Sequence, residues 1–159
     1  MSRTAKNPLW LRVRRLLPRG HDSTPVLLKG HLLIEEQLFA FIAAHCRHPK
    51  LLEEVRLTFA QKLRLAQSLS GGFTDLVRPL EKLNAIRNRM AHHVEITDLD
   101  TRIDDYLRAW AEDEFVPPKT ARDRTRHLRN SLIFQIAMIA GMSGAERAVR
   151  HSIEHERRA

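Results

Sequence analysis

The spacing of apolar side chains constrains this chain more than any other feature of its sequence. Apolar residues recur every three or four positions over most of the 159 residues. This period places them on one side of an α-helix, where they pack against other helices. The sequence therefore predicts an all-α fold, an up-and-down helical bundle of about five to six helices.

Proline and glycine mark where the predicted helices begin and end. In chain order we expect helices from Val26 to Cys46, from Leu51 to Ser70 in one or two pieces, from Arg78 to His93, from Leu99 to about residue 113, and from Thr120 to Ala140. Pro79 should lie in the first turn of the third helix, because a proline is tolerated there. Ser143 and Glu146 form a capping box, which predicts a separate short final helix.

Two predicted helices carry long seams on one face. The first seam comprises Leu27, His31, Ile34, Leu38, Phe41 and His45, widened by Leu28, Leu32, Phe39 and Ile42. The second comprises Leu76, Leu80, Leu83, Arg87, Met90 and Val94. Arg87 interrupts this second seam with a charge that cannot be neutralised. A guanidinium at such a position needs an acid, a phosphate or a water-filled cleft, so Arg87 is a candidate functional residue.

Composition and charge indicate a soluble protein with an anionic partner. Hydrophobic residues make up 43% of the chain and charged residues 29%, which is ordinary for a globular domain. The formal net charge of +8 favours phosphate backbones, ahead of acidic membranes and acidic proteins. Cys46 is the only cysteine, which excludes an internal disulfide and a thiolate zinc cluster. No apolar run approaches the roughly 18 residues that span a membrane, and we expect a cytoplasmic protein.

The first 25 residues are strongly basic. Arg3, Lys6, Arg12, Arg14, Arg15 and Arg19 precede the first acid, Asp22, with apolar residues interleaved. Three interpretations remain open for this arm: a basic amphipathic helix that contacts RNA or a partner, a transit peptide, and a solvated extension. Arginines within its apolar stretch argue against a secretory signal.

A concentrated group of polar side chains lies near the end of the third predicted helix. Asn84, Asn88 and His92 recur at every fourth position and form a polar line beside Arg87. The segment Arg87-Asn88-Arg89-Met90-Ala91-His92 resembles the Arg-Asn-x-x-x-His form of the signature of the HEPN superfamily, small all-helical domains that include many RNases. The helix around residues 59–66 and the Gly-Gly break after it are also similar to that family.

This resemblance implies an organisation in three parts. Residues 1–25 form the basic arm, residues 26–115 a HEPN-like helical core, and residues 116–159 C-terminal helices that pack on the core or at a dimer interface. The implied function is a metal-independent endoribonuclease with a toxin, stress or antiphage role. It would act as a homodimer without a cofactor, with an antitoxin or regulatory protein as a further partner. RNA would be cut by attack of its 2′-hydroxyl, leaving a cyclic phosphate.

Each residue type suits one step of that reaction. Arg87 is the candidate clamp on the phosphorane, His92 the acid or base, and Asn88 the group that orients phosphate or imidazole. The candidate supporting residues are His93, Asn84, Glu35 and Glu36, of which the two glutamates are either solvated or paired with Arg87 or an imidazole. Residues five apart lie about 140° apart around a helix. Arg87 and His92 can converge only through the reach of arginine, a deformed last turn or a dimer.

Other features of the sequence support different interpretations. Arg122, Arg126 and Arg129 are candidates for RNA contacts, and a merely solvated helix face is the alternative. A non-catalytic helical module that binds nucleic acid or a partner protein is the competing function. The segment from His151 to His155 fits a His-x-x-Glu-His zinc pattern but has no evident third ligand, so we predict no metal site.

Overall fold

The structure is a computed structural model that describes the backbone of residues 8–156 and the side chains of residues 8–144. Over the described backbone the fold is all-helical, as predicted. Its elements are α1 (Pro8–Leu16), α2 (Ser23–His45), α3 (Pro49–Leu52), α4 (Phe59–Leu69), the 3-10 turn η1 (Gly71–Phe73), α5 (Thr74–His92), α6 (Leu99–Ala111), the 3-10 turn η2 (Glu112–Glu114) and α7 (Ala121–Glu156). None of the described helices is long and apolar enough to cross a membrane.

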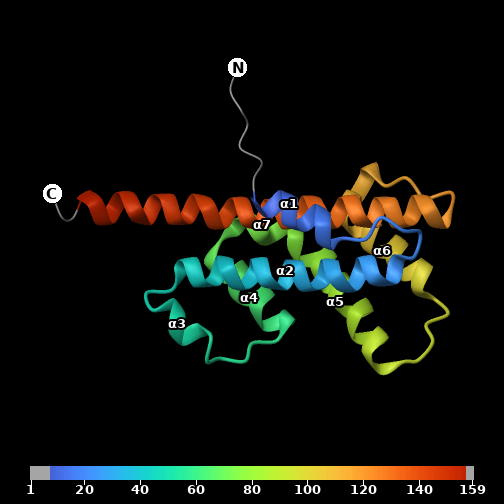
Figure 1. The fold of residues 1–159 in the computed structure, drawn as a ribbon, viewed down its shortest axis with the longest axis horizontal. Helices are drawn as coiled ribbons and strands as arrows, with labels where there is room; N and C mark the ends of the chain where they lie inside the picture. The colour runs from blue at the N-terminus through green and yellow to red at the C-terminus, as the bar shows by residue number, and fades with distance from the viewer. Residues whose placement is uncertain (1–7, 157–159) are drawn as a thin grey trace, which may run out of the picture.

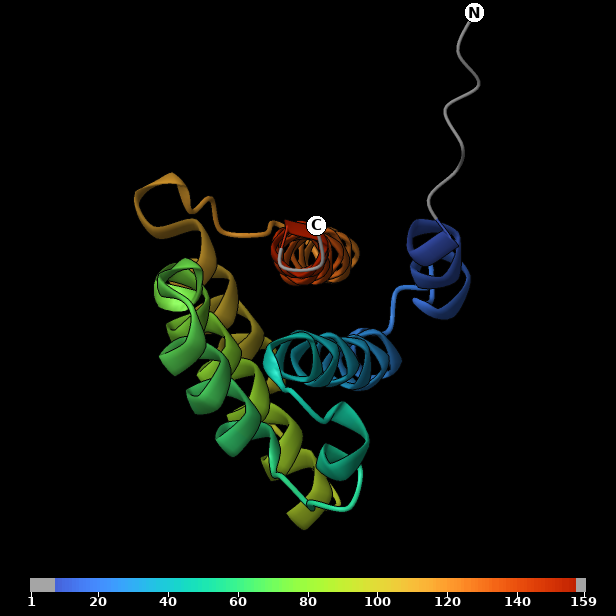
Figure 2. The same cartoon turned by 90° about the vertical axis from the view of Figure 1, so that its left-hand side faces the viewer.

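Helices α2 and α7 lie side by side and form the spine of the molecule (Figure 1). The hydroxyls of Ser23 and Thr125, near the starts of the two helices, are 2.8 Å apart, and Leu132 packs against Gly30 further along. The two helices therefore run in the same direction. Seen end-on, α4, α5 and α6 form a slanted layer on one side of this pair, and α1 lies on the other (Figure 2).

The helix directions agree only in part with an up-and-down bundle. Asn84 of α5 contacts His31 of α2, and Phe73 at the start of α5 packs against Phe41, so α5 runs antiparallel to α2. A short connection returns the chain along α6 in the opposite direction to α5. The longer connection through η2 then starts α7 parallel to α2 rather than antiparallel to it.

Most of the predicted seam of α2 is buried, and of the residues expected to widen it Ile42 is buried as well. Leu27, Ile34, Leu38 and Phe41 are buried, as is His31. Leu28 and Leu32, which we expected to widen the buried face, are exposed. The helix instead turns its other flank inward against α7, and that flank buries Val26, Leu33 and Gln37.

Helix α5 begins one turn earlier than predicted, which corrects two expectations. Pro79 lies inside the helix and is buried, rather than in its first turn. The buried seam comprises Leu76, Pro79, Leu80, Leu83 and Ile86. Ile86 therefore takes the inward position that we assigned to Arg87, and Arg87 is exposed. Val94 lies beyond the helix and is fully exposed.

Helix α7 continues through the break predicted after Ala140. The Ser143 hydroxyl, which we expected to cap a new helix, donates a 3.0 Å hydrogen bond to the carbonyl of Ile139 one turn earlier. A serine bonded in this way satisfies itself within a continuous helix. The start of α7 is as predicted, because the Thr120 hydroxyl accepts from the Asp123 amide at 3.1 Å. The side chain of Glu146 lies outside the described residues.

The basic arm is an ordered part of the fold rather than a solvated extension over its described residues. Val13 of α1 and Leu17 just after it are buried in the core. Arg12 forms an ion pair with Glu36 of α2. The arm therefore packs on the bundle through an apolar face and leaves Arg14, Arg15 and Arg19 on the surface.

Candidate functional site

The C-terminal end of α5 carries the predicted catalytic residues. Arg87, Asn88, His92 and His93 are all exposed, and Asn84 is half-buried. The helix stays regular through His92 and ends at His93, whose amide donates to the Arg89 carbonyl at 3.0 Å. The last turn is thus not deformed, and Arg87 and His92 leave the helix about 140° apart.

Arg87 stands between α2 and α5 with no carboxylate bound to it among the described residues. Within the described structure its side chain makes one polar contact, a long 3.4 Å hydrogen bond to the amide oxygen of the adjacent Asn88. It lines two surface hollows, one on each side of its side chain. An exposed guanidinium without an acid keeps its full capacity to bind phosphate.

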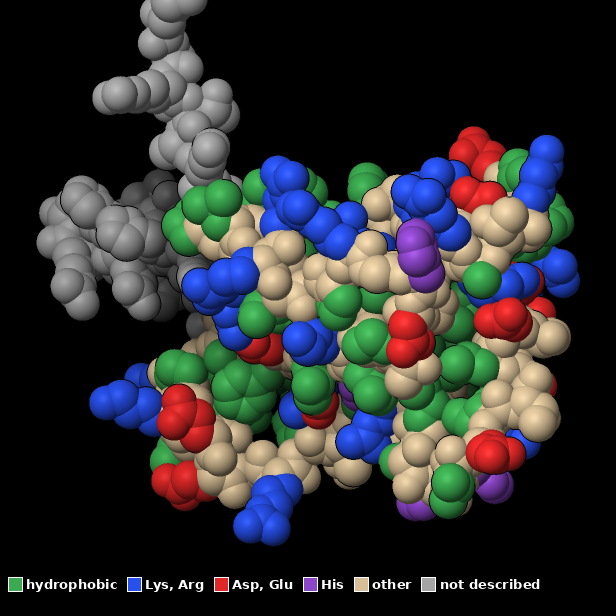
Figure 3. Space-filling view, turned by 45° about the vertical axis from the view of Figure 1, so that its right-hand side comes forward, with side chains coloured by type: hydrophobic (Ala, Val, Ile, Leu, Met, Phe, Trp, Pro, Cys, Tyr) green, Lys and Arg blue, Asp and Glu red, His purple; other side chains and the backbone are tan. Residues whose placement is uncertain are grey.

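The first of these hollows, the α2–α5 hollow, has a volume of about 460 Å³. It is lined by His31, Glu35, Thr58, Phe59, Ala60, Asn84, Arg87 and Asn88. In Figure 3 the surface below α2 is hollowed between the α3 segment and the C-terminal end of α5. The predicted residues Asn84, Arg87 and Asn88 therefore meet Glu35 at one concave surface.

His31 forms the buried wall of the α2–α5 hollow. Its Nε2 lies 3.1 Å from the Asn84 amide oxygen, and its ring stacks on Phe59 at 4.3 Å. The amide oxygen accepts, so the imidazole donates through Nε2–H. Burial lowers the pKa of His31, and Arg87 and Lys62 lower it further against the raising effects of Asn84 and Glu35. His31 is therefore a neutral side chain that fixes the orientation of Asn84.

The two glutamates predicted as supporting residues bind other cations. Lys62 of α4 donates a 2.8 Å hydrogen bond to Glu35, and Arg12 of α1 pairs with Glu36. Neither carboxylate contacts Arg87, so the structure does not support the alternative in which one of them pairs with that arginine. Glu35 still lies at the edge of the α2–α5 hollow, where its charge faces the same space as Arg87.

A second hollow, the Leu28 hollow, lies on the other side of Arg87 and has a volume of about 530 Å³. Arg87 and His93 both line it, together with Leu28, Met90 and Val94. His92 lines neither of these two hollows. Within one chain the structure therefore brings Arg87 together with His93 and not with His92.

No protein family, curated protein or solved structure matches this chain. The resemblance of residues 87–92 to the HEPN signature therefore stays a prediction from the sequence.

The predicted RNA-binding arginines lie together on α7. Arg122, Arg126 and Arg129 line a hollow of about 250 Å³ with Arg19 and His21 of the arm. Arg126 also pairs with Asp123 at 2.8 Å. We call Arg19, Arg122, Arg126 and Arg129 the α7 basic strip, and Figure 3 shows Lys and Arg side chains gathered over the α1 and α7 side of the molecule.

No group of three or more His, Cys, Asp or Glu side chains in the described part of the chain is arranged to hold a metal ion. The side chains of His151, Glu154 and His155 lie outside the described residues.

Sequence reasoning missed three contributors to these surfaces. His31 was placed on a buried seam, but nothing in the spacing showed that it would face Asn84, 53 residues later. Lys62 and Arg19 likewise reach their surfaces from distant segments. The one available signal was the presence of a polar imidazole on an otherwise apolar helix face, because such a group needs a partner.

Proposed function

We propose that this protein is a metal-independent endoribonuclease of the HEPN type that acts as a homodimer. The observation that carries the proposal is the exposed end of α5, where Arg87 has no carboxylate partner among the described residues, contacts Asn88 and shares the same helix end with His92 and His93. An unpaired cation, an amide and imidazoles are the groups that RNA cleavage by the 2′-hydroxyl requires.

The reaction can be assigned to these groups step by step. A neutral imidazole takes the proton of the ribose 2′-hydroxyl, and the oxygen attacks the adjacent phosphorus. Arg87 stabilises the phosphorane by donating two hydrogen bonds to its oxygens. The P–O5′ bond then breaks, and an imidazolium gives its proton to the leaving oxygen. The products are a 2′,3′-cyclic phosphate and a 5′-hydroxyl, and no redox step or external reactant is needed.

A second copy of the chain supplies what one copy lacks. In a single chain Arg87 and His92 point about 140° apart, so one side chain of each is not enough to form a compact site. Two exposed apolar side chains, Leu28 and Val94, line the Leu28 hollow with Arg87, and Leu32 is exposed one turn after Leu28 on α2. A two-fold contact through these residues would bury them and set Arg87 of one copy against His92 of the other.

The dimer model also gives distinct roles to the two histidines. His93 shares the Leu28 hollow with Arg87 and would lie in the interface, close to the apolar contact. His92 lies at the end of the helix and lines neither hollow, so the two-fold contact would have to bring it to the cleft of the other copy. We infer a toxin, stress or antiphage setting, with an antitoxin or regulatory protein as the further partner.

A second function is favoured by the α7 basic strip. Its four arginines line one hollow, and such a group of cations is suited to bind the phosphate backbone of RNA. A protein that bound RNA through this strip, and used α5 only to bind a partner, would be a regulatory module without catalysis. This is the alternative that the cleavage experiment separates from the first.

The deciding experiment is gel-resolved cleavage of tRNA and mixed cellular RNA in EDTA by the full chain. We expect the parent to produce fragments with cyclic phosphate and 5′-hydroxyl ends. Arg87→Ala and His92→Ala should each lower the cleavage rate by at least about a hundredfold, since each removes a group that acts in the transition state.

Arg89→Ala is the matched control, because Arg89 lies on the same turn of α5 but pairs with Asp98 at 3.6 Å. It should cleave like the parent. If all four proteins cleave alike, or if none cleaves although the parent binds RNA in a salt-dependent manner, the nuclease proposal is wrong and the binding module takes its place.

A further inference from the structure

A pocket between α1 and α7 gathers cationic and aromatic side chains that the proposed cleavage step does not use, although Arg19 and Arg129 also belong to the α7 basic strip. Its volume is about 600 Å³, within the range of roughly 300–1,000 Å³ that small-molecule sites occupy. We call it the arginine pocket and define it by Trp10, Arg14, Arg19, Arg129 and Asn130. It shares no residue with the two hollows beside Arg87.

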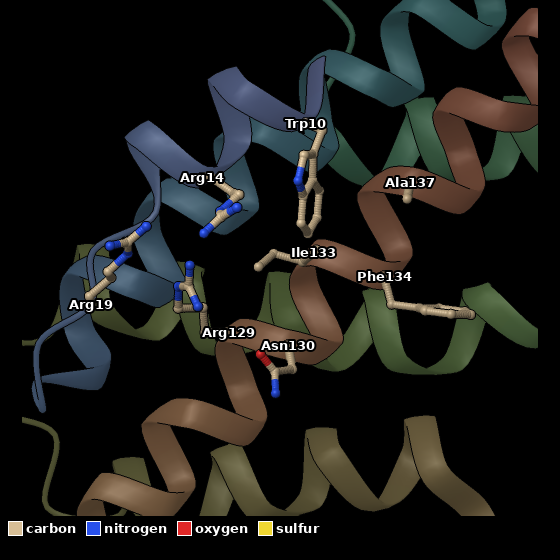
Figure 4. A pocket seen from close by; sticks show the side chains of 8 residues that line it. All are labelled: Trp10, Arg14, Arg19, Arg129, Asn130, Ile133, Phe134 and Ala137. Atoms are coloured by element: carbon tan, nitrogen blue, oxygen red, sulfur yellow. The ribbon is translucent and has the colours of Figure 1, made fainter. Parts of the chain in front are cut away.

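The three arginines reach this pocket from separate segments. Figure 4 shows the guanidinium groups of Arg14, from α1, and Arg129, from α7, pointing toward one another, with Arg19 beside them. Rigid helices carry two of the three side chains, and Arg19 follows Pro18, whose ring restricts the backbone. The fold therefore holds the backbone positions of the three cations close together.

No acid neutralises these cations among the described side chains. Neighbouring arginines on the same two helices do find carboxylates: Arg12 pairs with Glu36, and Arg124 pairs with Asp104 at 2.8 Å. No such ion pair is formed by Arg14, Arg19 or Arg129 within that part of the chain. Three like charges that share a pocket repel one another, so an anion bound between them would be strongly favoured.

Arg129 shows the strain of this arrangement most clearly. Its Nε is buried and has no hydrogen-bond partner in the described structure. Burial lowers the pKa of Arg129, and the charges of Arg19 and Arg14 lower it further. A partly buried guanidinium with an unused donor is costly unless a ligand or an acid binds it.

The indole ring of Trp10 lies next to the arginines. Trp10 is 41% exposed, and its indole extends from α1 toward α7 above Ile133 (Figure 4). The guanidinium carbon of Arg14 lies 5.7 Å from the indole centroid, so charge and ring surface are contiguous. Exposed aromatic rings next to arginines are the usual platform on which a nucleic-acid base stacks.

We propose that the arginine pocket binds a phosphomonoester of a nucleotide, with the phosphate on Arg14, Arg19 and Arg129 and the base on Trp10. A monoester carries a charge of about −1.5 to −2 near neutral pH, whereas a phosphodiester carries only one negative charge. Three converging cations therefore suit a terminal phosphate better than an internal one. The source is either the 5′-phosphorylated end of an RNA strand or a free nucleotide.

Binding of 3′-fluorescein-labelled 2′-O-methyl RNA hexamers to the full chain tests this proposal. The methyl group removes the 2′-nucleophile, so the result does not depend on whether the protein cleaves RNA. We expect the 5′-phosphorylated hexamer to bind about tenfold more tightly than the 5′-hydroxyl hexamer, because the phosphate forms charge-assisted hydrogen bonds.

Substitutions in the pocket should remove this preference. In Arg14→Gln and in Arg129→Gln the affinities for the two hexamers should differ by no more than about twofold. Arg14 is exposed, so Arg14→Gln should leave the fold intact, which circular dichroism can verify. Arg108→Gln changes the charge equally at an exposed residue of α6 and should retain the preference.

Competition identifies the ligand and the role of the indole. AMP that displaces the phosphorylated hexamer at equal concentration indicates a free nucleotide, and displacement only by phosphorylated RNA indicates a strand end. Trp10→Ala should weaken the binding of AMP and of the phosphorylated hexamer, and it should leave displacement by inorganic phosphate unchanged. The proposal is overturned if the parent binds both hexamers equally, or if Arg108→Gln loses the preference as fully as Arg129→Gln.

Discussion

The buried imidazole of His31 makes the stability of this fold depend on pH in a way that one substitution can isolate. Burial lowers its pKa in the folded protein below the ordinary value of about 6.5. Between the folded and unfolded pKa values the unfolded chain binds more protons, so the free energy of unfolding rises with pH. The contribution of neutral His31 is therefore fully present above the unfolded pKa and is lost as pH falls below it.

The size of this loss follows from a single proton. One proton taken up on unfolding changes the free energy of unfolding by about 1.4 kcal/mol per pH unit. Between about pH 7.5 and about pH 5.5 the largest possible loss from one histidine with an unfolded pKa near 6.5 is also about 1.4 kcal/mol. The His31 ring faces Asn84, Glu35, Arg87, Lys62 and Phe59. Of these, Asn84 and Glu35 favour the charged imidazole, so the loss of stability is smaller than this limit.

Urea unfolding at these two pH values measures the effect. The parent should lose more stability between them than His31→Gln, whose amide can still donate to Asn84 but does not titrate. His48→Gln is the matched control, because His48 is exposed, and it should lose as much as the parent. Equal losses in the parent and in His31→Gln would refute the assignment of a buried, neutral imidazole.

Two further predictions concern the dimer and the core. Leu32→Asp should weaken self-association at least about tenfold and lower RNA cleavage in step, as sedimentation and cleavage assays would show, because it places a charge in the proposed interface. Leu51 is 58% exposed and Leu32 60%, so Leu51→Asp is the control and should leave self-association and cleavage unchanged. If the two variants have equal effects, this interface is excluded. Tyr106→Phe should cost about 1–3 kcal/mol of unfolding free energy, because Gln135 loses its 3.0 Å hydrogen bond in a fully buried site. Adding Gln135→Leu to that variant should recover part of the loss, and a further loss instead would contradict the reasoning.

The helical period predicted the elements of this fold well, because each helix needs one apolar side whatever its neighbours are. The period predicted the long helix α2, and the glycine and capping residues predicted the break after α4 and the start of α7 near Thr120. The break predicted after Ala140 is wrong. Ser143 satisfies its hydroxyl within the helix, and the local pattern alone does not distinguish that bond from a cap.

The face that a helix buries was less predictable than the residues at which the helix begins and ends. On α5 the spacing allowed either Ile86 or Arg87 to continue the seam, and these residues differ by about 100° around the helix. The structure buries Ile86 and exposes Arg87. On α2 the same ambiguity left Leu28 and Leu32 outside the core. Such choices depend on partners that are distant in sequence, and a single helix does not specify them.

The candidate site was predictable only where its residues are adjacent in sequence. Arg87, Asn88 and His92 belong to one motif and were found together, and Arg122, Arg126 and Arg129 share one helix face. The contact of His31 with Asn84 and the pocket shared by Arg14 and Arg129 join segments that are brought together only by folding. No local pattern carries that information.

The distribution of acids on α2 explains why Arg87 remains unpaired. Glu35 and Glu36 are adjacent, so their side chains leave the helix about 100° apart and face different neighbours. Glu35 binds Lys62 of α4, and Glu36 binds Arg12 of α1. Each glutamate thus holds a neighbouring helix against α2, and neither is left to bind the guanidinium of Arg87. If Lys62 were absent, Glu35 would be the nearest anion on the wall of the same hollow and would compete with phosphate for Arg87. The ion pair with Lys62 therefore serves the proposed site indirectly, by keeping its only candidate clamp on α5 available to RNA.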